Sequence, residues 1–229
     1  MSAAPPGGPL RLFVAVDLPD DVRRALADAT SMLKRAGVDE GLRWVRPEGI
    51  HVTLKFLGET PSSKIPAITS ALENALAGAP AFELRPEGLG TFHGGRNPHF
   101  TREHPRESYP NNIRVLWVGV EGETALLAAL ASKVDEALVP LGLAAEKRPY
   151  SAHLTLARVR EDADRAVRER LSHGLEPYAS KSTMVVGRFD PALAPAFPSF
   201  RVERVSLMQS TLQRGGAVYR AMATFPLGT

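Results

Sequence analysis

The sequence predicts an α+β protein with two lobes related by a pseudo-twofold axis, each a mostly antiparallel sheet with helices on its outer side, and with the candidate site in a cleft between them. The first observation is a repeat, because residues 46–54 and 148–156 both read R-P-x-x-x-H-[VL]-T-L. The second is that each copy follows a strand pattern and then a helix pattern, so one strand–helix–strand unit is used twice. The third is composition: of 229 residues, 44% are hydrophobic and 23% charged, as in globular domains and unlike disordered or fibrous chains.

The first half of the chain is expected to begin with a disordered leader, because residues 1–9 are rich in Pro, Gly and Ala. Residues 10–16 (LRLFVAV) have the apolar pattern of a buried strand. A helix is expected to start at Asp20, a residue type that caps helix N-termini, and to stop near Gly37. The other elements expected in this half are a strand within 44–58, a helix over 62–76 and a strand near 82–92.

The second half is expected to repeat this order and then add closing strands. The expected elements are a strand over 113–120, a helix over 123–139 whose apolar stripe includes Leu126, a strand over 150–159, a helix over 163–172 ended by Gly174, and strands near 184–189, 200–212 and 218–225. The turn Arg214-Gly215-Gly216 makes the last two strands a hairpin. Residues 10–229 are thus expected to form a single bilobal domain, with the duplicated units around 46–57 and 148–159 and a long loop insertion at about 93–112.

Composition and charge exclude several classes of protein. The absence of cysteine excludes a disulfide scaffold, a thiolate metal site and a cysteine nucleophile, and it fits a reducing cytoplasm, where we expect the protein to reside. No apolar run approaches the roughly 18 residues of a membrane span. Twenty-eight Lys and Arg against 25 Asp and Glu give a net charge of only +3, less than is usual for a protein that coats DNA. This charge is compatible with a small anionic substrate or a short stretch of RNA as the ligand.

The repeated motif places chemistry on one face of each strand. Side chains alternate along a strand, so His51 and Thr53 share one face, and His153 and Thr155 share the corresponding face of the second copy. If the lobes face each other, two imidazoles and two hydroxyls converge. One neutral histidine can take a proton from water, one protonated histidine can donate to a leaving oxygen, and the hydroxyls can hold phosphate oxygens. The alternative is that both histidines are core residues preserved by the duplication for packing alone.

The sequence resembles the two-histidine phosphoesterases, and within them the RNA 2′,3′-cyclic phosphodiesterases, also called 2′-5′ RNA ligases (LigT type). The resemblance rests on the two H-x-T-L motifs and on four segments, RLFVAVDLP, HVTLKFLGE, LWVGV and LMQSTLQRGGAVY. It implies a bilobal fold that uses no metal or cofactor and opens a ribose 2′,3′-cyclic phosphate to a 2′-phosphate, with reversible 2′-5′ ligation as a related activity. It also implies that His51 is the general acid, His153 the base, and Thr53 and Thr155 phosphate ligands. The pseudo-symmetry alone leaves open which histidine plays which part.

Three further residues follow the H-x-T-L motifs. Arg158 matches an arginine that contacts the phosphate in the family, but strict alternation puts it on the apolar face, so it reaches the cleft only if the strand ends or bulges there. Otherwise it is a surface arginine. Phe56, its counterpart in the first copy, matches an aromatic residue near the nucleobase, although core packing is an equal alternative. Strand alternation puts Lys55 on the same face as His51, where its side chain could join the site. The alternative, an ordinary lysine exposed to solvent, is the commoner case.

The loop 93–112 departs from the family pattern, where a shorter connection is expected. It contains three histidines and three arginines: His93, His99, His104, Arg96, Arg102 and Arg106. The spacing is a poor zinc signature, so the alternatives are a basic loop that contacts RNA and a solvated insertion.

The expected partners are RNA with a 2′,3′-cyclic phosphate end or a cyclic nucleotide, with no membrane and no obligate protein partner. Two alternative functions remain open. One is hydrolysis of 2′-5′ oligoadenylate or of another cyclic phosphodiester at the same histidines. The other is a non-catalytic RNA- or nucleotide-binding module, against which the two intact histidines argue.

Overall fold

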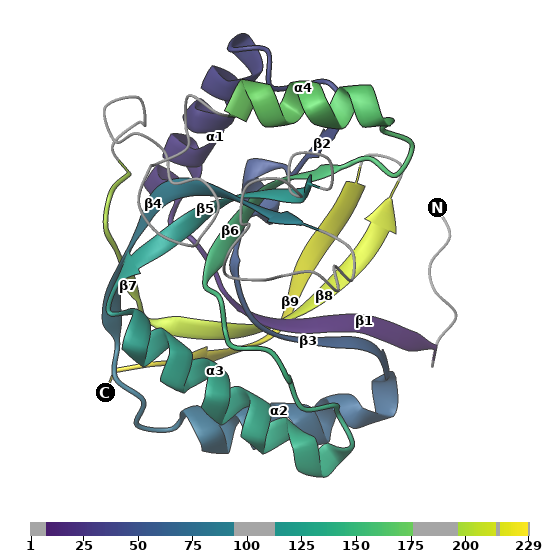
Figure 1. The fold of residues 1–229 in the computed structure, drawn as a ribbon. Coiled ribbons are helices and arrows are strands. Elements are labelled where there is room, and N and C mark those ends of the chain that lie inside the picture. The colour runs from purple at the N-terminus through teal and green to yellow at the C-terminus, as the bar shows by residue number, and fades with distance from the viewer. Residues whose placement is uncertain (1–7, 94–112, 176–196, 214–215, 229) are drawn as a thin grey trace, which may run out of the picture.

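The structure is a computed structural model that describes residues 8–93, 113–175, 197–213 and 216–228 (Figure 1). Most of the expected leader, the loop from residue 94 to 112 with its remaining histidines and arginines, the strand expected near 184–189 and two residues of the last turn lie outside the described residues. None of the described helices is long and apolar enough to span a membrane.

The described strands form one antiparallel sheet that divides into two lobes. The strands are β1 (Pro9–Val16), β2 (Leu42–Trp44), β3 (Val52–Pro61), β4 (Phe82–His93), β5 (Ile113–Gly122), β6 (His153–Val159), β7 (Phe200–Val202), β8 (Arg204–Gln213) and β9 (Gly216–Pro226). Their order is β7-β4-β5-β6-β3-β1-β8-β9, and β2 pairs with β6 off this path. At the centre, β3 and β6 share a single register pair, Val52 with Leu154. The sheet therefore separates into the lobes β3-β1-β8-β9 and β6-β5-β4-β7.

The central pair also marks the pseudo-twofold axis. Val52 and Leu154 each directly follow a motif histidine, so equivalent residues of the two repeats meet across the axis. The third strand of each lobe comes from the other half of the chain: β4 follows the first repeat but pairs with β5, and β8 follows the second repeat but pairs with β1. The two halves thus exchange a strand.

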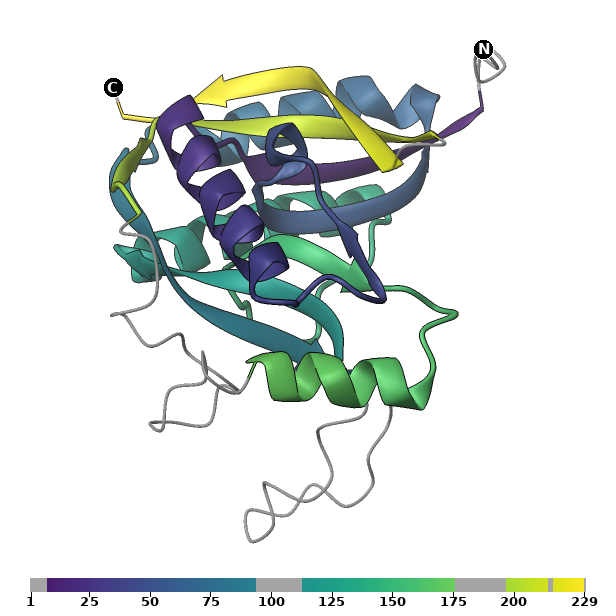
Figure 2. The ribbon, with the colours of Figure 1, turned by 90° about the horizontal axis from the view of Figure 1, so that it is seen from above.

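The helices lie on the outside of the lobes. They are α1 (Asp20–Arg35), α2 (Ile65–Leu76), α3 (Thr124–Leu138) and α4 (Arg165–Leu175). Figure 1 shows α2 and α3 side by side next to β1 and β3, with α1 and α4 at the opposite end of the molecule. Seen from above in Figure 2, α4 lies beside β4 and β5, and Arg168 of α4 donates to the Ile113 carbonyl of β5 at 2.8 Å. A continuous core runs through both lobes under these helices.

Most expected elements are confirmed, and four details were wrong. The strand expected near 200–212 is two strands, because β7 pairs with β4 in one lobe and β8 pairs with β1 in the other. Asp20 is the first residue of α1 and not its cap, because Pro19 takes the cap position without a side-chain hydrogen bond. Leu126 is 37% exposed, so it lies beside the buried stripe of α3 and not in it. Gly174 lies inside α4. The closing hairpin is confirmed by the β8–β9 register, which ends at Gln213 and Gly216.

Candidate active site

A β-bulge follows each H-x-T motif and changes which side chains reach the cleft. In the β1–β3 ladder, the register passes from Thr53 to Lys55 and skips Leu54. In the β5–β6 ladder it passes from Thr155 to Ala157 and skips the residue between them. An extra residue on one strand reverses the alternation beyond it, so the equivalent bulges turn the side chains that follow.

The bulges place Phe56 and Arg158 on the histidine side of the sheet. Both are exposed, whereas the two residues before each are buried. Arg158 was expected to reach the cleft only if its strand ended or bulged, and the bulge is present. Phe56 is 63% exposed, which is incompatible with the core-packing alternative.

The same bulge overturns the expectation for Lys55. Its side chain is buried on the helix side, where it forms an ion pair with Asp135 of α3 and donates to the Ala144 carbonyl at 2.6 Å. Lys55 therefore ties β3 to α3 and the loop after it, and it does not join the motif side chains.

The two histidines are held in the same way. The Nδ1 atom of His51 lies 2.8 Å from the Gly49 carbonyl, and that of His153 lies 2.8 Å from the Ser151 carbonyl. A carbonyl can only accept, so Nδ1 carries the proton in both rings. This leaves Nε2 of each neutral ring as the atom with a free lone pair, and the same atom becomes the donor once the ring is protonated.

Aromatic side chains pack around both imidazoles. The ring of Phe13 stacks on His51 with centroids 4.6 Å apart, and Tyr219 meets it edge-on at 5.1 Å. Phe92 meets His153 edge-on at 4.7 Å, and Trp117 lies 6.4 Å from the same ring.

No role was predicted from the sequence for these four aromatic residues. Three of them stand in segments that carry the family resemblance: Phe13 in RLFVAVDLP, Trp117 in LWVGV and Tyr219 in QRGGAVY. That membership is the signal that was present. Phe92 had no such signal.

Burial lowers the pKa values of both histidines. It is the main cause that brings the pKa of His51 from 6.5 to about 4, against the raising effects of the Gly49 hydrogen bond and of the Asp17 charge. His153 contributes a smaller lowering effect, which places the two imidazoles near each other. Burial also lowers the pKa of His153, and the Arg158 charge lowers both values, so its guanidinium lies near both rings. In the free protein both imidazoles are neutral at pH 7, and an anionic ligand would favour protonation of one.

The motif threonines complete the face. Thr53 and Thr155 are partly exposed, and neither hydroxyl forms a hydrogen bond within the described part of the chain. Tyr150, which precedes the second motif, donates its hydroxyl to the Thr53 carbonyl at 3.0 Å and so links the lobes beneath the site. Two imidazoles, two free hydroxyls and one guanidinium thus gather around the pseudo-twofold axis, a set that suits a phosphate group.

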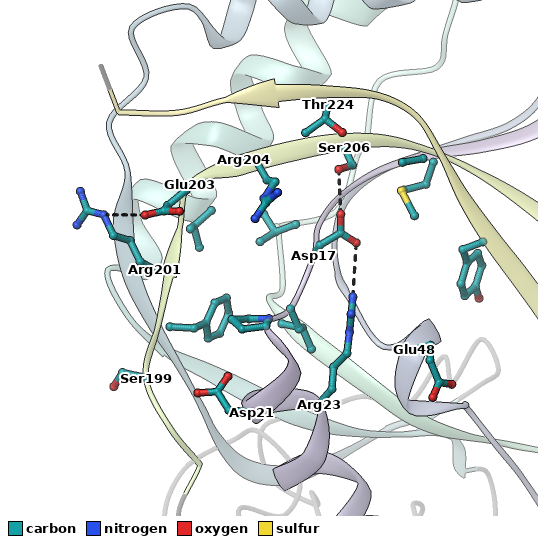
Figure 3. Close-up of a pocket in the computed structure, with 18 residues that line it drawn as sticks. Asp17, Asp21, Arg23, Glu48, Ser199, Arg201, Glu203, Arg204, Ser206 and Thr224 are labelled. Carbon is teal, nitrogen blue, oxygen red and sulfur yellow. Dashed lines mark hydrogen bonds and ion pairs between the residues drawn. The ribbon is translucent and has the colours of Figure 1, made fainter.

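A cavity of about 710 Å³ lies near His51, between the first lobe and β7 of the second, and neither motif histidine lines it (Figure 3). Tyr219 lines it, and Asp17 accepts from the Ser206 hydroxyl at 2.9 Å and lies 4.0 Å from Arg23. Its charged side chains include both signs, several of them paired with each other, as Figure 3 shows for Arg201 and Glu203. The cavity therefore lacks the paired imidazoles and is space next to them.

Comparison with known proteins identifies relatives over most of the chain. The model of the LigT-like phosphoesterase family matches residues 16–101 and 118–190. A protein of Methanothermobacter thermautotrophicus named RNA 2′,3′-cyclic phosphodiesterase is 31% identical, over 95% of this chain and 99% of its own length. A protein of Archaeoglobus fulgidus with the same name is 30% identical, over 94% and 99%.

Solved structures share the fold. The crystal structure of TT0787 from Thermus thermophilus has a TM-score of 0.65 and 25% identity, over 95% of this chain and 98% of its own. The E. coli LigT structure in complex with 3′-AMP has a TM-score of 0.64 and 23% identity, over 96% and 99%.

Proposed function

Because this chain belongs to the LigT-like phosphoesterase family, we propose that it hydrolyses ribose 2′,3′-cyclic phosphates, on RNA ends or nucleotides, to 2′-phosphates with His51 and His153 as general acid and base. The observation that carries the proposal is the duplicated geometry. Each histidine is fixed through Nδ1 on a carbonyl two residues earlier, which leaves its Nε2 free. In each copy a threonine whose hydroxyl forms no hydrogen bond within the described residues follows two residues later. Relatives that are about 30% identical over nearly the whole chain are named for this activity.

The side chains of this protein can supply both proton transfers of the reaction. One neutral imidazole takes a proton from water, and the water oxygen attacks phosphorus. The bond from phosphorus to the ribose O3′ breaks, and the other imidazole, in its protonated form, gives its proton to O3′. The products are a 2′-phosphate and a free 3′-hydroxyl. Thr53, Thr155 and Arg158 hold the non-bridging oxygens, whose negative charge increases during attack.

The resemblance makes His51 the acid and His153 the base. The register adds a physical reason for this asymmetry, because Val16 pairs with Val52, which places Asp17 next to His51, whereas Gly119 pairs with His153. A carboxylate favours the protonated form of a neighbouring imidazole. Burial opposes this effect strongly at His51, so the acid role depends on the charge of the bound phosphate.

The first experiment measures hydrolysis of adenosine 2′,3′-cyclic phosphate in excess EDTA and identifies the product isomer. His51→Ala and His153→Ala are compared with wild type and with His173→Ala, a histidine of α4 outside both motifs. We expect only the 2′-phosphate, with losses of about 10²–10⁴-fold in each motif variant. Folded motif variants that keep activity within a few-fold of wild type, or a 3′-phosphate product, would overturn the proposal.

A second substrate separates the two roles. Bis(p-nitrophenyl) phosphate has a leaving group that needs no protonation, so loss of the acid matters less there than with the cyclic phosphate. We expect His51→Ala to lose much less activity on this ester than on the cyclic phosphate, and His153→Ala to lose activity on both. The reverse pattern would exchange the assignments and leave the proposed reaction intact. Reversible 2′-5′ ligation would use the same site with the 5′-hydroxyl of a second strand in place of water. The base would take the proton of that hydroxyl, its oxygen would attack phosphorus, and O3′ would leave with the proton of the acid, so that a 2′-5′ phosphodiester forms. The cytoplasmic location stays a prediction.

A further inference from the structure

The short strand β2 places a second arginine beside Arg158. In the β2–β6 ladder Arg43 is the direct register partner of Arg158, with Leu42 opposite Val159 and Trp44 opposite Ala157. In the second repeat, the described residues 142–152 contain no strand equivalent to β2. The addition is therefore specific to one side of the cleft, the side of His153.

Arg43 faces the same side of the sheet as Arg158. Leu42 and Trp44 pack against the core, whereas Arg43 and Arg158 are both exposed. Directly opposed residues on neighbouring strands have Cβ atoms about 4.5–5.5 Å apart. Because Arg158 lies on the histidine side, the guanidinium of Arg43 extends the positive surface of the site outward from the reacting centre.

Neither guanidinium is neutralised within the part of the chain that the structure describes. The carboxylate that interacts with Arg43 belongs to Asp162, and Arg160 already holds it with bonds of 3.0 and 2.7 Å. Like charges directly opposite each other destabilise a sheet. A ligand anion between or beside them would relieve this repulsion, so the pair is arranged for a phosphate-bearing ligand.

Resting on the proposed function, we propose that Arg43 binds the phosphodiester that precedes the cyclic phosphate, so that this site has a higher kcat/KM for an RNA strand of two or more nucleotides than for a free cyclic nucleotide. Arg158 holds the reacting phosphate, and Arg43 holds the next phosphate along the strand. On the other side of the cleft the equivalent of Arg158 is the exposed ring of Phe56, which has no charge to offer a second phosphate. The cleft therefore distinguishes a phosphate side from a base side.

The test compares two substrates that differ by one phosphodiester. Adenosine 2′,3′-cyclic phosphate has no second phosphate, whereas the dinucleotide ApA with a terminal 2′,3′-cyclic phosphate has one. For Arg43→Gln we expect kcat/KM to fall about tenfold on the dinucleotide, equivalent to about 1.4 kcal/mol, and less than about twofold on the mononucleotide. Arg24→Gln, the same change at an exposed arginine of α1, should leave both values unchanged. Equal losses on both substrates, or no loss on either, would overturn the inference.

A binding measurement keeps this inference separate from the proposed reaction. If wild type turns over neither substrate, the proposed function fails, and Arg43 is then judged from the affinity for a labelled oligonucleotide with a 2′-phosphate end at increasing salt. One lost phosphate contact should reduce the slope of log K against log salt by about 0.7 relative to wild type and Arg24→Gln. Equal slopes would overturn it. The melting temperature of Arg43→Gln should equal or exceed that of wild type, and a marked decrease would instead assign Arg43 to folding.

Discussion

Burial of His51 should make the folded protein sensitive to acid. In the unfolded chain this histidine takes up a proton near pH 6.5, but in the folded protein its pKa is about 4. Between these values the unfolded state binds more protons than the folded state, so the free energy of unfolding decreases as the pH falls through this window. At about 1.36 kcal/mol per pH unit, the full loss is about 3 kcal/mol, of which about 2.5 kcal/mol is reached by pH 4.5.

The assay is urea unfolding of wild type and His51→Gln at pH 7 and pH 4.5. Glutamine does not titrate, so the variant lacks this contribution, whatever its stability at neutral pH. Relative to wild type, the variant should therefore gain about 2.5 kcal/mol on going from pH 7 to pH 4.5. His153→Gln should shift in the same direction, because burial also lowers the pKa of His153. A stability difference between wild type and His51→Gln that does not change with pH would refute the reasoning.

Three further predictions concern side chains around the site. A Cβ added at Gly90 would lie 2.2 Å from two ring atoms of Trp117, so Gly90→Ala should lower the free energy of unfolding by about 1–3 kcal/mol. Calorimetry should show the melting temperature falling by about 2–4 °C per kcal/mol, and an unchanged melting temperature would contradict the packing described. Lys55→Met leaves Asp135 without its cation, so urea unfolding should show a free energy of unfolding about 3 kcal/mol lower than that of wild type. A decrease below about 1 kcal/mol would contradict this role of the ion pair. Phe56→Ala should leave the melting temperature unchanged but lower kcat/KM for adenosine 2′,3′-cyclic phosphate by the equivalent of about 1–3 kcal/mol; a similar loss on ribose 2′,3′-cyclic phosphate, which has no base, would exclude stacking.

The repeat was enough to predict the two lobes and the meeting of the motifs, because two copies of one buried unit pack most simply around an axis between them. Alternation then correctly placed Val52 and Thr53 on opposite faces. It failed two residues later at Lys55, since a bulge depends on the partner strand and leaves no mark in the local pattern. Alternation also put Arg158 on the apolar face, and it was expected to reach the cleft only if its strand ended or bulged. The β5–β6 register shows such a bulge.

Other parts of the site depend on contacts between distant segments. Tyr219 reaches His51 only because β8 and β9 return to the first lobe, and no local periodicity predicts which lobe a closing strand joins. Arg43 lies on a three-residue strand that is too short for a periodic signal, and its significance comes from its register partner on β6. These are tertiary pairings, which a single sequence does not contain.

The exchange of β4 and β8 has a consequence for how such a chain could arise and how it can be divided. Neither half contains the third strand of the lobe in which its own motif lies, so a fragment ending after β4 and a fragment beginning at β5 would each expose an unfinished sheet edge and should regain a complete site only when mixed. A half-length ancestor with one motif would have needed a second copy to supply its missing strand and its second histidine. Fusion of two such copies would turn an association that depends on protein concentration into a covalent one.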